Sequence, residues 1–164
     1  MLKNKIKSLR SLRRIIALLQ KKGRKIVFTN GCFDILHLGH AQYLQAAKAL
    51  GDILVVGVNS DSSVKIIKGH SRPIVGQNER ISLIAALESV DFAVLFNEDT
   101  PARLIQALRP DVLVKGADWK KNDIVGASFV DSYGGKVATI KLVKGLSTTS
   151  LIKKIIAASK EQQD

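Results

Sequence analysis

Residues 25–40, KIVFTNGCFDILHLGH, decide the fold of this chain. Their apolar, β-branched beginning predicts a buried strand, and Gly31 permits a sharp exit that a side chain would hinder. His37 and His40 then fall on one face of the following helix, close to its N-terminus. Backbone N–H groups and the helix dipole attract anions at such an end. The segment therefore predicts a phosphate site, and nucleotide chemistry is the first hypothesis.

Strands and helices alternate along the rest of the chain. We expect strands at about 25–30, 52–58, 91–96, 111–115 and 136–142, and helices at about 38–50, 77–89, 100–108, 123–133 and 148–160. The residues between the second strand and the second of these helices are expected to form a polar loop. This alternation predicts an α/β fold: a doubly wound, Rossmann-like, five-stranded parallel sheet with helices on both faces. Ligands of such folds bind beyond the carboxyl ends of the strands, where the strand order switches.

Residues 8–21 predict one further helix, which is amphipathic. Leu9, Leu12, Ile16 and Leu19 recur at spacings of three and four, with basic residues mostly between them. We expect this helix to dock on the core, and an arm that contacts membranes or RNA is the alternative. A single domain over residues 1–164 is therefore expected, with a basic helix over residues 1–23 and an α/β core over residues 24–164.

The formal net charge of +12 is concentrated in this N-terminal part. The first 25 residues hold ten basic and no acidic side chains, and the other 139 hold 16 basic and 14 acidic ones. The core is thus nearly neutral, so we expect no nucleic-acid partner. No apolar run reaches the roughly 20 residues that cross a bilayer, so no stable membrane insertion is expected. The single cysteine, Cys32, excludes an internal disulfide and favours a cytoplasmic localisation.

Neither GxGxxG nor GxxxxGK[ST] occurs, which leaves the histidine pair to handle phosphates. Asp34 lies three residues before His37, but no nearby cysteine or further histidine completes a metal site, so no protein-bound metal is expected. The segment GLSTTSLIKKII, residues 145–156, predicts a second anion site. Ser147 is a good N-cap there, which leaves the N–H groups and hydroxyls of Thr148 and Thr149 at a helix start. Plain capping is the alternative.

A third basic segment, KIIKGHSRPIVGQNER, spans residues 65–80. Its glycine and proline residues predict a mobile cover that brings charge over bound phosphates. We expect such a function for only one or two of its four candidates, which are Lys65, Lys68, Arg72 and Arg80. Trp119 either lines a pocket or caps the core.

These motifs together resemble a known family. TNGCFDILHLGH with GLSTTS closely resembles the HxGH nucleotidyltransferases of the cytidylyltransferase-like superfamily. With VGVNSD, RPIVGQNER and FNEDTPARLIQALRPDVLVKGADW, the chain is most similar to the D-glycero-β-D-manno-heptose 1-phosphate adenylyltransferases. Leu142 stands where glycerol-phosphate cytidylyltransferases carry an arginine, which disfavours that activity, and Ala117 departs from the expected KGGD-type form.

The resemblance implies transfer of AMP from ATP to heptose 1-phosphate, giving ADP-heptose and pyrophosphate for lipopolysaccharide core synthesis. It also implies Mg²⁺ bound mainly through the ATP phosphates, a separate heptose kinase in the pathway, and a homodimer as one arrangement. Other HxGH transferases, acting on glycerol phosphate, FMN or phosphopantetheine, remain alternatives. A non-catalytic nucleotide sensor or RNA-binding module is a further one.

Roles for individual residues follow from this resemblance. His37 and His40 would donate hydrogen bonds to the triphosphate and stabilise the pentacoordinate α-phosphorus. Lys68 and Arg80 would close over the phosphates, with Lys65 as the substitute for Lys68. No general base is needed, because a phosphate monoester is mostly dianionic at neutral pH.

The remaining candidates surround the nucleotide and the acceptor. Asn59 and Asp61 are expected to meet the sugar phosphate or its hydroxyls, whereas Asp34 orders the turn and the helix start. Cys32 is expected to pack rather than to act as a nucleophile. The positions assigned to nucleotide binding are Thr29, Asn30, Gly31, Cys32, Phe33, Lys115, Gly116, Gly145, Ser147, Thr148 and Thr149.

Overall fold

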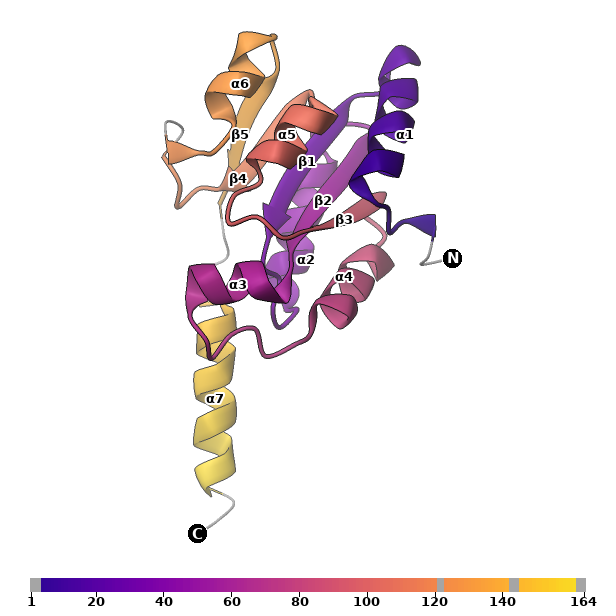
Figure 1. The fold of residues 1–164 in the computed structure, drawn as a ribbon. Coiled ribbons are helices and arrows are strands. Elements are labelled where there is room, and N and C mark those ends of the chain that lie inside the picture. Colours follow the sequence, from indigo (N-terminus) through magenta and orange to yellow (C-terminus); the bar gives the residue numbers. More distant parts are fainter. Residues whose placement is uncertain (1–3, 121–122, 142–144, 162–164) are drawn as a thin grey trace.

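The computed structural model describes residues 4–120, 123–141 and 145–161. Five parallel strands form one sheet in the order β3-β2-β1-β4-β5 (Figure 1). The strands are β1 (Ile26–Gly31), β2 (Ile53–Asn59), β3 (Phe92–Phe96), β4 (Val112–Gly116) and β5 (Lys136–Ile140). The expected doubly wound sheet is confirmed.

The beginning of the central strand β1 is apolar at every position because both faces of the sheet are covered there. Successive side chains of a strand point to opposite faces of the sheet. Val27 packs on one face with residues of α2 and α4, whereas Ile26 and Phe28 pack on the other with residues of α1, α5 and α6. All three are fully buried. A strand covered on both faces needs apolar residues at every position.

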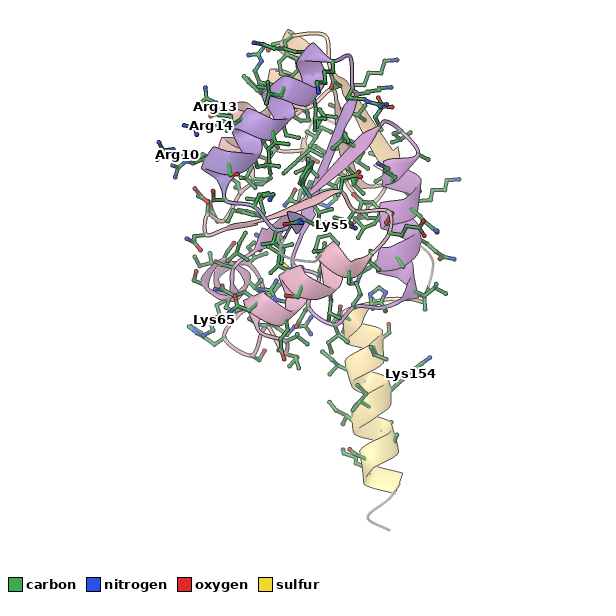
Figure 2. The ribbon with its side chains drawn as sticks, turned by 90° about the vertical axis from the view of Figure 1, so that its right-hand side faces the viewer. Lys5, Arg10, Arg13, Arg14, Lys65 and Lys154 are labelled. Carbon is green, nitrogen blue, oxygen red and sulfur yellow. The ribbon has the colours of Figure 1, made fainter. Side chains whose placement is uncertain are left out.

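Seven helices lie within the described residues. They are α1 (Leu9–Lys21), α2 (Leu38–Lys48), α3 (Asp61–Lys68), α4 (Gln77–Ala86), α5 (Ala102–Leu108), α6 (Ala127–Ser132) and α7 (Thr148–Glu161). The first six surround the sheet, whereas α7 projects away from the body (Figures 1 and 2). In the described part of the chain, no helix has both the length and the apolar character that a membrane span requires.

The N-terminal helix docks on the core, as the sequence predicts. Leu12 and Ile16 are buried, and α1 packs against α5 and β3. Arg10, Arg13 and Arg14 point outward from the opposite side of α1 (Figure 2). The basic residues therefore form the solvent face of a docked helix.

Several elements differ from the sequence-based expectations, and α4 ends at Ala86 rather than at residue 89. Residues 61–68 form the helix α3 instead of a loop, and the hydroxyl of Ser60 caps it by accepting the N–H of Ser63. Only two positions of α3 are buried, so its apolar periodicity was too short to recognise. The helix α6 begins at residue 127 rather than 123, after Gly126 in the left-handed region at φ 87°. β5 ends at Ile140, and the expected departure at Leu142 lies outside the described residues.

Candidate active site

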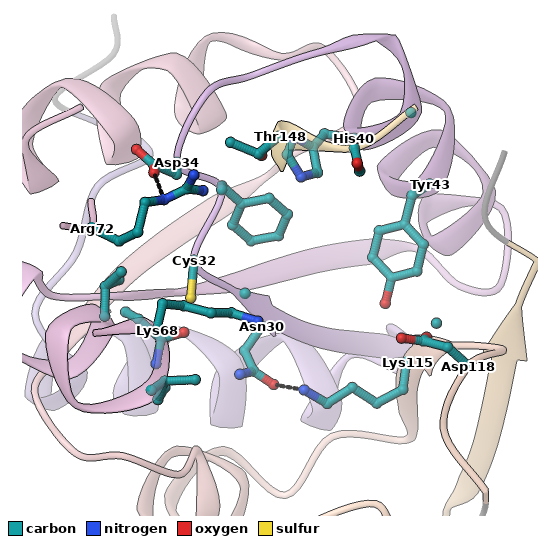
Figure 3. A pocket seen from close by; sticks show the side chains of 18 of the residues that line it. Asn30, Cys32, Asp34, His40, Tyr43, Lys68, Arg72, Lys115, Asp118 and Thr148 are labelled. Carbon is teal, nitrogen blue, oxygen red and sulfur yellow. Dashed lines mark hydrogen bonds and ion pairs between the residues drawn. The ribbon is translucent and has the colours of Figure 1, made fainter. Parts of the chain in front are cut away.

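A cavity of about 670 Å³ opens at the carboxyl ends of β1 and β4 (Figure 3). The helix α2, which follows β1, covers one face of the sheet, and α6, which follows β4, covers the other. This is the switch in strand order at which ligands of such folds bind. The turn after β1, the starts of α2 and α7, the α3 segment and the residues after β4 supply the walls.

The two histidines of HLGH form one stacked unit in the cavity wall. His37 is the N-cap of α2, with extended backbone angles (φ −141°, ψ 169°), and His40 lies in the first turn. Their rings stack with centroids 3.8 Å apart and an interplanar angle of 20°. The ring of Phe33 meets His40 edge-on at 5.3 Å. The phenyl ring and the stacking therefore fix the orientation of both imidazoles.

Burial determines the charge of this pair. Desolvation, followed by the proximity of His37, lowers the pKa of His40 to about 4. Burial also lowers the pKa of His37. The Nδ1 atoms of both rings are buried and lack a hydrogen-bond partner among the described residues. The pair thus presents neutral rings with unused hydrogen-bonding capacity at neutral pH.

The glycine of HLGH has a steric role. A Cβ atom on Gly39 would lie 3.1 Å from the His37 ring and 3.3 Å from Cβ of Leu146. Gly39 therefore lets the His37 ring fold over the start of α2. It also lets the segment that leads into α7 approach α2 closely, which brings the two helix starts together.

The start of α7, which the sequence predicts as a second anion site, lies in the wall of the same cavity. The hydroxyl of Ser147 accepts the N–H of Ser150 at 3.1 Å, so Ser147 is the cap of this helix. The backbone N–H groups of Thr148 and Thr149 lie in the first turn, where an α-helix has no internal acceptors for them. Ser147, Thr148 and Thr149 line the same cavity as the histidine pair, and Thr148 lies beside His40 (Figure 3).

The end of β1 forms the floor of the cavity. Gly31 leaves room for the ring of Phe33, which would lie 3.1 Å from a Cβ atom at that position. Phe33 itself has a φ of 46°. The sharp turn expected at Gly31 is therefore made two residues later, and the glycine serves the close approach of the aromatic ring. Cys32 also lines the floor, and burial raises the pKa of its thiol, which fits the packing role expected for it.

Lys115 and Asn30 connect β4 to β1 across the floor. Nζ of Lys115 donates a hydrogen bond to Oδ1 of Asn30 at 2.6 Å. Burial lowers the pKa of Lys115 to about 8. Gly116 lines the cavity beside it. These three expected nucleotide-binding residues are therefore cavity residues.

Thr29 is not in the cavity wall, contrary to the prediction. Its side chain is fully buried, and Oγ1 shares a 2.7 Å hydrogen bond with the hydroxyl of Tyr43 and donates to the carbonyl of Val114 at 3.0 Å. These bonds tie β1 to α2 and β4. Thr29 therefore supports the cavity from beneath. Gly145, another predicted residue, also lies outside the lining.

Arg80 lies beneath the cavity rather than over it, which corrects a second prediction. The side chain is fully buried. Its guanidinium donates to the carbonyls of Val75, Cys32 and Asn59, and it pairs with Asp61 at 2.9 Å. Three separate segments thus converge on one cation. The arginine is committed to holding the turn after β1, the end of β2 and the loop before α4 together.

The expected acceptor contacts are also partly changed. Asp61 lies outside the cavity lining, because Arg80 engages its carboxylate. Asn59 lines the cavity, although its amide nitrogen donates to Oγ of Ser63 at 2.8 Å. Lys65 is exposed and lies outside the lining. The substrate-binding set predicted from sequence is thus reduced to Asn59.

The segment after α3 is fastened to the turn after β1. Oδ1 of Asp34 accepts the N–H groups of Ile74 and Val75 at 2.8 and 2.9 Å, and its Oδ2 lies 2.6 Å from Nε of Arg72. Asp34 is 3% exposed. The aspartate thus orders a turn, as expected, but it anchors the predicted mobile cover rather than the start of α2. Of the basic candidates, Lys68 and Arg72 line the cavity.

The sequence did not identify several residues of the wall. Trp119 is 48% exposed and lines the cavity, which decides between the two interpretations given above. Asp118 and Thr100 also line it. Both follow the end of a strand, so the rule that had selected Lys115 would have selected them. Tyr43, which comes from the middle of α2, carried no such signal.

The described residues contain no group of three or more histidine, cysteine, aspartate or glutamate side chains placed to hold a metal ion. Asp34, the carboxylate nearest the histidine pair in the sequence, is already bonded to Arg72 and to two backbone N–H groups.

Comparison with known proteins gives the site a family context. The family model described as "Cytidylyltransferase-like" matches residues 28–156. "Bifunctional protein HldE" of Geobacter sulfurreducens is 51% identical over 96% of this chain, and that of Helicobacter acinonychis is 52% identical over 88%. The aligned regions cover 32% and 30% of those proteins, so this chain spans about a third of the length of the curated relatives it matches.

Two solved structures are similar as well. The lipopolysaccharide core biosynthesis protein from Thermoplasma volcanium GSS1 has 36% identity and a TM-score of 0.60, covering 74% of this chain and 98% of that one. Pantoate-beta-alanine ligase from Francisella tularensis has a TM-score of 0.64 over 91% of this chain and 72% of that one, at 17% identity. The second likeness concerns the fold alone.

Proposed function

The chain belongs to the cytidylyltransferase-like family of nucleotidyltransferases, and on that premise we propose that it transfers AMP from ATP to D-glycero-β-D-manno-heptose 1-phosphate. The products are ADP-heptose and pyrophosphate, for lipopolysaccharide core synthesis. The observation that carries the proposal is the meeting of the HLGH pair with the capped start of α7 in one cavity. The identity to relatives named HldE and to a lipopolysaccharide core biosynthesis protein supports the choice of substrate.

The reaction is an in-line displacement at the α-phosphorus. An oxygen of the sugar phosphate forms a bond to this phosphorus, and the bond to the bridging oxygen of the β-phosphate breaks. The acceptor is mostly dianionic at neutral pH, so no proton has to be removed from it. The electron pair leaves on pyrophosphate. Catalysis then consists of positioning two polyanions and stabilising the charge that develops.

We assign this work to three sets of groups. His37 and His40 are neutral at rest and act as oriented hydrogen-bond donors to the α-phosphate. The N–H groups and hydroxyls of Thr148 and Thr149 hold the β- and γ-phosphates that become the leaving group. Positive charge comes from Lys68 and Arg72, which line the cavity, although Arg72 also pairs with the Asp34 carboxylate.

Mg²⁺ enters this scheme as part of the substrate. The described residues offer no cluster of ligands that would hold the ion on their own. We propose that it arrives bound to the ATP phosphates, which supply hard oxygen ligands. When bound, it neutralises phosphate charge. A cytoplasmic location would provide both ATP and Mg²⁺.

The acceptor must come from another reaction. A kinase that phosphorylates the anomeric hydroxyl of the heptose would supply heptose 1-phosphate.

The test is incubation of the protein with ATP, Mg²⁺ and heptose 1-phosphate, followed by mass analysis for ADP-heptose. Parallel reactions contain CTP in place of ATP, and glycerol 3-phosphate, FMN or phosphopantetheine in place of the sugar phosphate. We expect ADP-heptose and pyrophosphate in the first reaction only. Product from a different pair at a higher rate would assign the chain to another branch of the family.

A further inference from the structure

The side chain of Lys115 is a cation that the proposed mechanism does not yet use. It leaves the end of β4, crosses the cavity floor and donates to Oδ1 of Asn30 on β1 (Figure 3). Among the ion pairs of the described residues, none involves Lys115. The ring of Trp119 lies 5.8 Å from its Nζ, and the Asp118 carboxylate favours its charge from a distance, but burial still outweighs both. Burying an ammonium group without a contacting carboxylate is costly, and a methionine would fill a similar volume without that cost. Packing alone therefore does not account for a lysine here.

The hydrogen bond determines which way the Asn30 carboxamide faces. An ammonium group has donors only, so it must meet the oxygen of the carboxamide and not its nitrogen. The NH₂ group of Asn30 therefore lies on the branch directed away from Lys115. Among the described residues, no acceptor forms a hydrogen bond with this NH₂ group. The group is accessible rather than enclosed, and Asn30 lines the cavity. Both of its N–H bonds are available to a ligand.

The position of Asn30 indicates which ligand this is. Asn30 and Lys68 lie on one side of the turn at Cys32, and His40 and Thr148 lie on the other (Figure 3). Attacking and leaving oxygens are roughly in line in phosphoryl transfer, so the acceptor approaches from the side opposite the leaving group. With pyrophosphate leaving toward Thr148, the acceptor phosphate arrives on the side of Asn30.

We propose that Asn30 binds the phosphate of the acceptor through its NH₂ group, and that Lys115 is a positioning residue that holds the Asn30 carboxamide in this orientation. The inference rests on the proposed function, because it assigns one of the two phosphate sites of that reaction. The recognised group is a phosphate monoester dianion. Without Lys115 the carboxamide is free to turn its oxygen toward the dianion, where it repels the ligand instead of donating to it.

The experiment compares Lys115→Met, Asn30→Ala and the double variant with the wild-type protein in the formation of ADP-heptose. We expect each single variant to raise the KM for heptose 1-phosphate by about tenfold or more, as for the loss of a hydrogen bond to a charged group. The KM for ATP should stay within about twofold. Lys154→Met, which removes the same charge from the exposed side of α7 (Figure 2), is the matched control and should behave as wild type.

A positioning role is separated from a purely structural one by the double variant. If Lys115 acts through Asn30, adding Lys115→Met to Asn30→Ala should change the KM for the acceptor by less than about twofold, since coupled residues are not additive. Lys115→Arg, which keeps a charged donor, should recover part of the acceptor affinity. Binding of a non-hydrolysable ATP analogue, measured by calorimetry, should be unchanged in all variants and shows that they are folded.

Three results would overturn the inference. The first is a double variant in which the effects of the two single substitutions on the KM for heptose 1-phosphate multiply. The others are a single variant in which the KM values for ATP and heptose 1-phosphate rise equally, and an unaltered KM for heptose 1-phosphate in Lys115→Met. If the wild-type protein forms no ADP-heptose, the proposed function fails instead.

In that case the roles of Lys115 and Asn30 are tested by calorimetry with inorganic phosphate in the presence of the ATP analogue. Weaker phosphate binding by Lys115→Met would support the assignment, and equal affinity would refute it.

Discussion

The imidazole of His40 lies face to face with that of His37, with 3.8 Å between the ring centroids. Two cationic rings at this separation would repel each other, and burial already disfavours their protonation. The stacked pair is therefore an arrangement for neutral histidines. In the proposed reaction they would present oriented N–H donors, and lysine and arginine elsewhere in the cavity would supply the charge.

Replacing His40 by alanine should reduce kcat by about 10²–10³, the usual cost of removing one preorganised donor to a transition state. The fold should survive, because His40 lies at the start of α2 and the apolar core of that helix begins at Tyr43. Thermal unfolding of the purified variant checks the fold, and pyrophosphate release checks the rate. Near-normal turnover in a folded variant would refute the assignment.

The depressed pKa of His40 predicts a pH dependence of stability. The folded state binds this proton only near pH 4, whereas an unperturbed histidine binds it near pH 6.5. Between these values the unfolded chain takes up more protons, so the free energy of unfolding should decrease as the pH falls from about 6.5 to 4. Urea unfolding from pH 7.5 to 4.5 measures this, and His40→Gln should flatten the curve in that window.

A direct measurement is the titration of the His40 Cε1 resonance by NMR. The midpoint should lie near pH 4 in the free protein. Addition of a non-hydrolysable ATP analogue should move it upward, because a nearby polyanion favours the protonated ring. A midpoint near 6.5 in the free protein would show that the ring is more hydrated than the stacked geometry implies.

Arg80→Met should destabilise the protein by about 3 kcal/mol, because it leaves the buried carbonyl of Asn59 and the part-buried carbonyls of Val75 and Cys32 without their donor. The midpoint and slope of urea unfolding give this free energy. Arg103→Met is the matched control, since its guanidinium is largely exposed and pairs with Glu98. If Arg80→Met kept wild-type stability but lost ATP affinity, Arg80 would have to contact phosphate directly, contrary to its position.

Gly39→Ala tests the steric role of the HLGH glycine. Alanine is the better helix former by about 1 kcal/mol, so an unobstructed substitution would stabilise α2. The new Cβ atom would instead press on the His37 ring at 3.1 Å and on Leu146 at 3.3 Å. We expect Gly39→Ala to lower kcat, because the His37 ring is displaced, and to leave the melting temperature without the increase that a better helix former would give. Gly76→Ala, whose Cβ would have no neighbour closer than 3.7 Å, is the control and should retain activity.

The sequence predicted those elements in which local pattern and tertiary position agree. The strand at Ile26–Gly31 is apolar on both faces because helices cover both, and that requirement is visible in the residues themselves. The cap at Ser147 was likewise predicted, since its hydroxyl acts three residues away. The rule that strand ends gather at one edge then placed HLGH and STT in one cavity.

The errors concern side chains whose partners lie far along the chain. From the sequence, Arg80 was interpreted as a cation available to phosphates. In the folded chain its guanidinium instead donates to the carbonyl of Cys32, which is 48 residues away, and to that of Asn59, which is 21 residues away. Lys65 and Lys68 looked equivalent in the sequence. Both lie on the short helix α3, but Lys68 lines the cavity whereas Lys65 points outward. Long-range hydrogen bonds and the rotation of α3 leave no local signature.

The starts of α2 and α7 lie at one cavity although the whole of β2, β3, β4 and β5 separates them along the chain. The proposed phosphate-binding surface is complete only when every strand between the two helix starts has taken its place. Affinity for a nucleotide would then be a property of the finished sheet, and no fragment ending before Thr148 should possess it. A bound triphosphate would in turn resist the opening of any one strand, because each such event separates the groups that hold it.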